Sequence, residues 1–506
     1  MTARERGLLI GLGGVAWLLA STAAATRYVD YSRLGGYRRL WADMAVGITA
    51  YLDAAYPEGT APAVGVKPDG DPHKVYENLL LARIRHERVG PWEFWRTVTP
   101  KPFLRRRVAP EPRAHDDQGR AVLLGLGFRA LGGISPFLIL WLGAFASVPV
   151  VFWTGWELSA VGHPIAGATL LGLLGLSPYF IGTLLLPRYT PGFYLIAVLL
   201  IVPLSAYAVL APRVTLRGLL VRALLAAVGF AGAGLCRSTV GLLLPGFALA
   251  LVLAGRRAAG SPWRRGAVVV GALLAFLLPY PAMKGAQAHD LWQPLWEGLG
   301  DFDREKGYTW SDQVAGAYAR ERGAEELWTA ESEAVFRGSV LRDIRTDPGW
   351  YAAILARRLG ATLSLRKLWP WRAPSGVPIA LSRSTNEGGM DKYWMYAPTA
   401  DRIGFGRNIP EVPVPVLVLP TLTLVLLSLA PWVGPACRRQ AARRLAVLAC
   451  PALACLPLPV LITTAGGQEP QAIAIVYLLG TALLFELALR APLGHHVPAP
   501  TGRTNP

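Results

Sequence analysis

Long apolar runs without charge alternate along the chain with polar stretches. A run of about 20 helical residues crosses the hydrocarbon layer of a membrane, so each run is a candidate transmembrane helix. Ten such runs lie at 7–25, 138–156, 164–186, 190–211, 215–235, 239–255, 266–283, 413–433, 445–463 and 471–489. The pattern predicts an all-α polytopic membrane protein with about ten transmembrane helices and two large polar segments.

The two polar segments divide the chain into successive regions. We expect a first transmembrane helix in 1–26, a first polar segment with juxtamembrane helices in 27–137, helices two to seven in 138–283, a second polar segment in 284–412, three more transmembrane helices in 413–489 and a tail in 490–506. The stretch 122–130 is expected to lie along the membrane surface. The second segment is rich in Trp, which predicts that it folds back on the membrane face. Helices are predicted there at 311–322, 329–346 and 348–363.

Two of the apolar runs leave alternatives open. The first has basic residues before it and small residues near its end, as a signal peptide does, but its apolar stretch is long, which favours a retained anchor. Arg222 interrupts the run 215–235 and is expected to extend to the membrane interface. A total of nine or eleven helices therefore stays open.

Composition and charge indicate an orientation. The chain has 506 residues, 53% hydrophobic and 17% charged, with a formal net charge of +18. Of its 33 acidic residues, 12 lie in 27–120 and 17 in 284–411, so most of the positive excess lies in short connectors and helix ends. These connectors alternate as the positive-inside rule requires if both termini are cytoplasmic. We expect a protein of the plasma (inner) membrane with extracytoplasmic polar segments, and no nucleic-acid partner.

Several motifs occur in order near the ends of the apolar runs. They are Asp116-Asp117-Gln118-Gly119-Arg120, Leu186-Pro187-Arg188-Tyr189-Thr190, Cys236-Arg237-Ser238-Thr239, His289-Asp290-Leu291-Trp292 and Asp347-Pro348-Gly349-Trp350-Tyr351. With the apolar first helix and the Asp-containing first polar segment, this order resembles the integral-membrane GT-C glycosyltransferase superfamily, of the dolichyl-phosphate-mannose or aminoarabinose transferase type. The resemblance covers residues 7 to about 360.

The resemblance implies an activity and its partners. Such enzymes are hexosyl or pentosyl transferases that move a sugar from a polyprenyl-phosphate carrier to an acceptor on the extracytoplasmic face. An aspartate of the first outer loop acts as the base, and an inverting reaction is expected. The partners implied are the bilayer and the lipid-linked donor. The acceptor, a lipid, a glycan or a protein, stays open.

The candidate bases are Asp71, Asp116 and Asp117. Transfer to a hydroxyl needs a group that takes its proton, and an ionised carboxylate at the membrane face can do so. Each of the three precedes a predicted helix, where a carboxylate also serves as a cap, so a structural role is the alternative. Asp30 and Asp43, nearer the first run, are further candidates.

The candidate phosphate ligands are Arg237, Arg188 and His289, with Arg237 first. The lipid phosphate leaves as an anion, and the forked guanidinium of arginine suits phosphate. An interfacial anchor is the alternative for the arginines, and a solvated surface side chain is the alternative for His289. Glu469, in a turn between the last two runs, is a candidate for binding the sugar or the acceptor, or else a solvated turn residue.

Metal chemistry has weak candidates. Asp69-Gly70-Asp71 and Asp301-Phe302-Asp303 each place two carboxylates one residue apart, which can share a hard cation. The pattern is common by chance, so we expect no metal cofactor, with Asp69 and Asp71 as the exceptions to test. The four cysteines have no paired spacing, which predicts neither a disulfide nor a metal site.

Two other functions compete with sugar transfer. A polysaccharide polymerase or ligase would also carry large outer segments with arginines. A transporter or flippase for a lipid-linked or small solute would place ionisable residues near the middle of the membrane in broken helices. The apolar runs have essentially no such residues, which favours the transferase.

Overall fold

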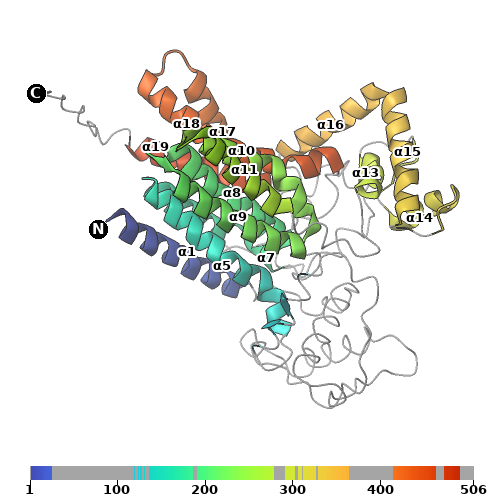
Figure 1. Ribbon diagram of the computed structural model, residues 1–506, viewed down its shortest axis with the longest axis horizontal. Helices are drawn as coiled ribbons and strands as arrows, with labels where there is room; N and C mark the ends of the chain where they lie inside the picture. The colour runs from blue at the N-terminus through green and yellow to red at the C-terminus, as the bar shows by residue number, and fades with distance from the viewer. Residues whose placement is uncertain are drawn as a thin grey trace, which may run out of the picture.

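The computed structural model describes an all-α membrane protein (Figure 1). It covers residues 2–25, positions 119, 123–124, 126–127 and 130, then 136–185, 191–277, 291–363 with short gaps at 302–305, 310, 326 and 328, 414–462 and 472–490. Within these residues, six helices are long and apolar enough to cross a membrane: Ala3–Ala25, Gly192–Leu210, Leu216–Cys236, Ser238–Arg257, Pro435–Ile462 and Ile473–Arg490.

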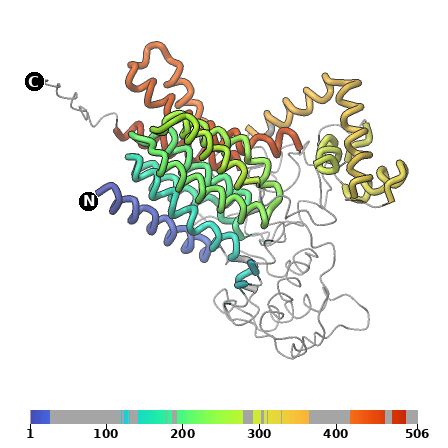
Figure 2. The backbone as a smooth tube through the Cα atoms, in the orientation of Figure 1, coloured from blue at the N-terminus to red at the C-terminus, as the bar shows by residue number. Residues whose placement is uncertain are grey.

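The membrane helices form one bundle. Its elements are α1 (Ala3–Ala25), α5 (Pro136–Ala160), α6 (Pro164–Leu176), α7 (Pro178–Leu184), α8 (Pro191–Leu210), α9 (Leu216–Cys236), the 3₁₀ helix η4 (Ser238–Leu243), α10 (Leu244–Arg257), α11 (Pro262–Leu277), α17 (Val414–Leu429), α18 (Pro435–Cys455), the π-helix η7 (Leu458–Ile462) and α19 (Ile473–Arg490). Figures 1 and 2 show these helices side by side, with a second helical region at one end.

Helix α8 occupies the centre of the bundle. It contacts α5, α9, α10 and α18, and nearly all its side chains are buried, as expected for a helix that is apolar all round. Helix α9 is different, because Leu224, Leu225 and Val228 are exposed while Ala226 and Phe230 are buried. An exposed apolar face on a membrane helix is the face that suits lipid.

The expected helix 164–186 is two helices, so this boundary was predicted wrongly. Helix α6 ends at Leu176 and α7 starts at Pro178. Pro178 has no N–H to continue the ladder of α6 but fits the first turn of a new helix. The hydroxyl of Ser177 accepts a hydrogen bond from the Phe180 N–H at 3.2 Å and caps that turn.

Helix α18 begins ten residues before the apolar run that predicted it. Pro435 is at its first turn, and a stretch containing Arg438, Arg439, Arg443 and Arg444 precedes the apolar part. Charge ends an apolar run without ending a helix, since arginine has a high helix propensity. The run 445–463 is therefore the second part of a longer helix, which closes in η7.

The connectors rich in arginine gather at one end of the bundle, here called the basic end. Two short strands, β1 (Val214–Thr215) and β2 (Ala258–Ala259), pair in parallel and join two of these connectors. Arg257 donates to the carbonyls of Ala208 and Ala211, both at 2.7 Å. Figure 1 shows the start of α1 and the end of α19 at this same end. The grouping agrees with the predicted alternation of the connectors.

The opposite end of the bundle carries a helical lobe, residues 291–363. Its elements are α13 (Trp292–Gly298), the 3₁₀ turn η5 (Leu299–Asp301), α14 (Asp312–Arg320), α15 (Ala330–Thr346) and α16 (Pro348–Leu363). The three predicted helices are confirmed as α14, α15 and α16. Ser311 and Thr329 cap the first two, and the Asp347 carboxylate accepts from the Trp350 N–H at 3.0 Å at the start of the third.

Trp296 forms the centre of the lobe. It is 1% exposed, and its ring lies 4.8 Å from Tyr318, 5.3 Å from Tyr308 and 5.5 Å from Phe336. Aromatic clusters of this kind bury much apolar area and prefer tilted or edge-on contacts, as here. This aromatic cluster joins α13, α14 and α15, and its buried residues are continuous with the hydrophobic core of the bundle.

Candidate functional site

Arg237 is the predicted phosphate ligand that the structure describes. The other predicted site residues lie outside the described part of the chain: Asp30, Asp43, Asp69, Asp71, Asp116, Asp117, Arg188, His289 and Glu469. Helix α9 starts beside the strand pair at the basic end, so its last residue, Cys236, lies at the end of the bundle that carries the lobe. Arg237 follows at once.

Arg237 forms an elbow between two helices. Its backbone is extended, with φ −154° and ψ 103°, and separates α9 from η4. Its N–H donates to the Ala233 carbonyl at 2.8 Å, and its carbonyl accepts from the Val240 N–H at 3.0 Å. The half-buried guanidinium thus belongs to a residue with a firmly held backbone. A cation at a helix C-terminus is favoured by the helix dipole, which is the structural alternative for this arginine.

Gly119 contacts the end of the same helix. A Cβ atom at Gly119 would lie 2.5 Å from the Leu235 Cβ and 2.8 Å from the Leu235 carbonyl oxygen, so only glycine fits. Gly119 follows Asp117 by two positions, and Leu235 precedes Arg237 by two positions. The contact therefore joins the two motifs that the sequence had singled out separately.

The helical positions that follow Gly119 also pack on the bundle. Leu124 is fully buried in the main hydrophobic core, whereas Leu126 is exposed. A Cβ at Gly127 would lie 2.2 Å from the Leu138 side chain of α5. This stretch was expected along the membrane surface, and its described residues show one face covered by the bundle and one face open.

The lobe is tied to the bundle through Arg358. This side chain of α16 is fully buried, and its Nη1 donates to the carbonyls of Val460 and Leu461 in η7, at 3.2 and 3.0 Å. Val460 and Leu461 lie in the last turn of η7, and the last carbonyls of a helix have no intrahelical N–H partner. Gly298 of α13 packs on the same turn, since a Cβ there would lie 1.9 Å from the Ile462 carbonyl oxygen.

Arg358 was missed by the sequence reasoning, although a signal exists. Ile354, Arg358 and Thr362 recur every four residues, and all three are buried on one face of α16. Arg357, its neighbour, is exposed. An arginine in register with buried positions indicates a specific acceptor, because a buried guanidinium needs hydrogen bonds.

Two carboxyl groups are buried among the described residues of the lobe. Glu333 accepts from the backbone N–H groups of Trp292 at 2.9 Å and Gln293 at 3.3 Å. Glu297 accepts from the Gln293 side-chain amide at 3.0 Å, and its burial, with the nearby charge of Asp312, raises its pKa from 4.5 to about 8. Glu297 therefore holds its proton at neutral pH. The described residues contain no group of three or more potential metal ligands.

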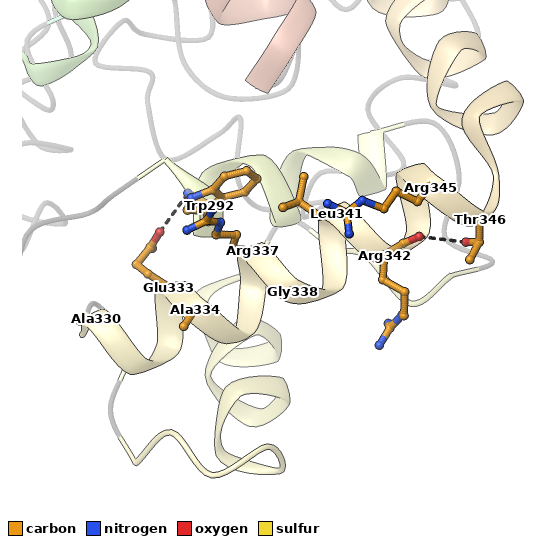
Figure 3. A pocket seen from close by; sticks show the side chains of 10 residues that line it. All are labelled: Trp292, Ala330, Glu333, Ala334, Arg337, Gly338, Leu341, Arg342, Arg345 and Thr346. Atoms are coloured by element: carbon orange, nitrogen blue, oxygen red, sulfur yellow. Dashed lines mark hydrogen bonds between the residues drawn. The ribbon is translucent and has the colours of Figure 1, made fainter.

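A groove on α15 is lined by arginines. Its cavity volume is about 650 Å³, and its lining includes Trp292, Arg337, Gly338, Leu341, Arg342 and Arg345 (Figure 3). We call it the arginine groove. Figure 3 shows Arg337 beside Trp292 and Arg345 beside Leu341. The guanidinium of Arg337 lies 5.8 Å from the centre of the Trp292 ring, within range of a cation–π interaction.

Among the described residues, the bundle has two buried acids, both near its basic end. Glu157 pairs with Arg222 at 2.9 Å, a partner that the sequence did not predict. The Arg222 guanidinium also stacks over the Tyr207 ring at 3.9 Å. Glu486 accepts from the Ala166 N–H at 3.0 Å and contacts His163 and Arg490. These pairs lie away from Arg237 and hold helices together.

The end of the bundle that carries the lobe therefore combines three features. The first is the Arg237 elbow, whose neighbour Leu235 contacts Gly119. The second is the set of hydrogen bonds from Arg358 to η7, here called the Arg358 joint. The third is the arginine groove. Comparison of the chain with family models, with curated proteins and with solved structures found no match.

Proposed function

We propose that this protein is a membrane glycosyltransferase that moves a sugar from a polyprenyl-phosphate-linked donor to an acceptor at the extracytoplasmic face. The observation that carries the proposal is the contact of Gly119 with Leu235. It joins the sequence neighbourhood of Asp116 and Asp117 to that of Arg237. A base and a phosphate ligand must lie on opposite sides of one sugar, so their motifs have to meet at one place.

The chemistry divides between these residues. Asp117 or Asp116 takes the proton of the acceptor hydroxyl as its oxygen bonds to the anomeric carbon of the sugar. The bond from that carbon to the phosphate oxygen breaks, and the polyprenyl phosphate leaves with the electron pair. Arg237 stabilises the charge that develops on the phosphate through its forked N–H groups. Attack from the side opposite the phosphate inverts the anomeric carbon.

The helix arrangement suits an arginine in this role. The extended backbone of Arg237 is held on both sides by hydrogen bonds, which limits the positions that its side chain can reach. Preorganised donors are more effective than mobile ones, because they need not reorganise as charge develops. A residue at the end of a membrane helix is expected near the lipid headgroups, where a membrane-borne phosphate lies, and Arg237 directly follows α9.

The test uses purified protein in lipid nanodiscs and a radiolabelled polyprenyl-phosphate hexose. Arg237→Gln should lower the rate of sugar release about a hundredfold or more, the size expected when a donor to the developing charge is lost. Arg213→Gln, an exposed arginine of the basic end, is the matched control and should retain full rate. Thermal unfolding of both variants should match that of the native protein. Full activity of Arg237→Gln would exclude the proposal.

A second set of variants identifies the base. Asp71→Asn, Asp116→Asn and Asp117→Asn are compared at saturating donor, and the one that abolishes transfer with unchanged donor binding carries the proton. Gly119→Val should also abolish transfer, because its side chain would clash with Leu235 and separate the two motifs. Retained transfer in all four variants would contradict the assignment. Product mass then distinguishes addition of one sugar from transfer of a whole chain by a polymerase or ligase.

A further inference from the structure

The arginine groove has a charge that the lobe leaves uncompensated. Arg342 pairs with the Asp343 carboxylate at 3.0 Å. Glu333, the acidic lining residue, already accepts two backbone N–H groups. Arg337 and Arg345 form no ion pair with any acid in the described part of the chain. The groove therefore presents two guanidinium groups to a ligand.

The two arginines lie at different parts of the groove. Arg345 follows Arg337 by eight positions, a rise of about 12 Å along the helix axis. Figure 3 shows the Arg337 side chain beside Trp292 and the Arg345 side chain beside Leu341, so the groove offers two separate positions for an anionic group. An extended chain with at least two anionic groups can occupy both positions without moving either arginine. The planar guanidinium suits either phosphate or carboxylate, since it donates two parallel hydrogen bonds.

The floor between the arginines is apolar and open. Trp292 and Leu341 line it, and a Cβ at Gly338 would meet no atom within 4 Å. The Trp292 backbone is held by Glu333, and Arg337 lies over its ring. An aromatic ring with a few fixed polar groups is the usual composition of a site for a small or extended ligand. The carbon–hydrogen faces of sugar rings fit such a floor.

We propose that the arginine groove binds an anionic glycan, a chain of sugars with carboxylate or phosphate groups, which is the acceptor or a part of it. The identification as acceptor rests on the proposed function, whereas the binding itself does not. Figure 1 shows α15 in the lobe beyond α13 and away from the bundle, so a soluble chain can reach it. This position favours a glycan over the headgroups of the surrounding lipid.

The test is a binding measurement with full-length protein in nanodiscs of uncharged lipid. The probe is a fluorescent oligogalacturonate, and uncharged dextran of matched length is the reference. Native protein should bind the first and not the second, with affinity that falls as salt screens the charges. The double variant Arg337→Gln/Arg345→Gln should bind the probe about tenfold or more weakly, a change that each lost charged hydrogen bond can produce.

Two further variants separate the groove from general charge. Gly338→Leu fills the open floor without removing a charge and should also weaken binding about tenfold; leucine favours the helix, so the lobe stays folded. Arg320→Gln removes an exposed arginine of α14 outside the groove and should bind normally. Equal binding by native protein and both groove variants would overturn the inference. Weaker binding of the probe by Arg320→Gln would also overturn it, because general charge would then be the cause. If anionic lipid in the nanodisc abolished binding of the probe, lipid headgroups would be identified as the ligand of the groove.

The two proposals fail separately. If the native protein transfers no sugar but the groove variants lose glycan binding, the groove remains a glycan site and the transferase proposal is excluded. Sugar transfer with no binding of any anionic glycan excludes the groove as an acceptor site and leaves the Arg237 assignment in place.

Discussion

The bundle and the lobe bury their carboxyl groups in different ways. In the bundle, Glu157 faces Arg222 and Glu486 faces His163 and Arg490, so each acid has a basic partner. In the lobe, Glu333 accepts two backbone N–H groups and Glu297 keeps its proton. A buried carboxylate must be compensated in either region. In the bundle, basic side chains compensate it, whereas in the lobe backbone N–H groups stabilise Glu333 and protonation removes the charge of Glu297.

The difference decides which arginines remain for a ligand. In the bundle, Arg222 and Arg257 are used in packing, by a carboxylate and by backbone carbonyls. In the lobe, Arg337 and Arg345 form no ion pair with an acid in the described part of the chain, and both stay exposed in the groove.

The largest effect is expected from breaking a bundle pair. Arg222→Gln leaves Glu157 buried beside a neutral side chain, and we expect the free energy of unfolding to fall by about 3 kcal/mol. The double variant Glu157→Gln/Arg222→Gln should recover most of this loss, because no charge remains to compensate. Thermal unfolding in detergent measures both. Equal destabilisation by the single and double variants would mean that the ion pair is not the cause.

An intermediate effect is expected from the lobe acid. The pKa of Glu297 is about 8 in the folded lobe and near 4.5 when unfolded, so the folded state binds more protons between these values. Stability of the lobe should be greatest below pH 4.5, should fall as pH rises from about 4.5 to about 8, and should level off above that. Glu297→Gln should remove this dependence. Hydrogen exchange of the α13 amides, compared between native and variant at each pH, measures it.

The control for this experiment is α19 in the same samples. Its amides should exchange equally in native protein and Glu297→Gln at every pH, because Glu297 lies in the lobe and not in the bundle. A lobe whose protection rises with pH would show that the carboxyl is ionised when folded.

The smallest effect is expected at the surface of the lobe. Lys306 lies 3.2 Å from the Asp347 carboxylate and 4.2 Å from the centre of the Trp350 ring, and all its partners are partly exposed. Exposed ion pairs contribute little to stability because water screens them, so Lys306→Ala should shift the thermal midpoint only slightly. The Asp347 pKa, which is lowered by the Trp350 N–H first and by Lys306 second, should rise a little in the variant. A titration followed by NMR of labelled Asp measures this, and a large drop in stability would contradict it.

Local signals predicted the lobe helices well. Thr329 and Ser332 form a capping box at the start of α15, and the Asp347-Pro348 pair begins α16, so boundaries followed from short-range chemistry. The bundle helices were predicted in position but not in extent. The break at Ser177 depends on a capping serine followed by a proline, and the early start of α18 depends on a helical stretch that contains arginines. A search for apolar runs detects neither feature.

The sequence named candidate residues for the site but not the contacts between them. The sequence singled out Arg237 and the motif with Gly119, but their contact through Leu235 joins positions more than a hundred residues apart, which no local pattern encodes. The burial of Glu297 and Arg358 was not foreseen for the same reason. A polar residue in an amphipathic helix is predicted to be exposed when only the sequence is known, because the sequence does not show which other element covers it.

The Arg358 joint sets an order in which the chain can be assembled. Its acceptors, the carbonyls of Val460 and Leu461, are made 102 and 103 residues later than Arg358 itself, and the Tyr477 hydroxyl that donates to the Leu363 carbonyl comes 114 residues after that carbonyl. The ring contacts of Trp296 involve Tyr308, Tyr318 and Phe336, so they can form before the residues of η7 and α19 are made. The contacts of the lobe with η7 and α19 can form only after those helices have been made, so docking of the lobe on the bundle is a late step of assembly.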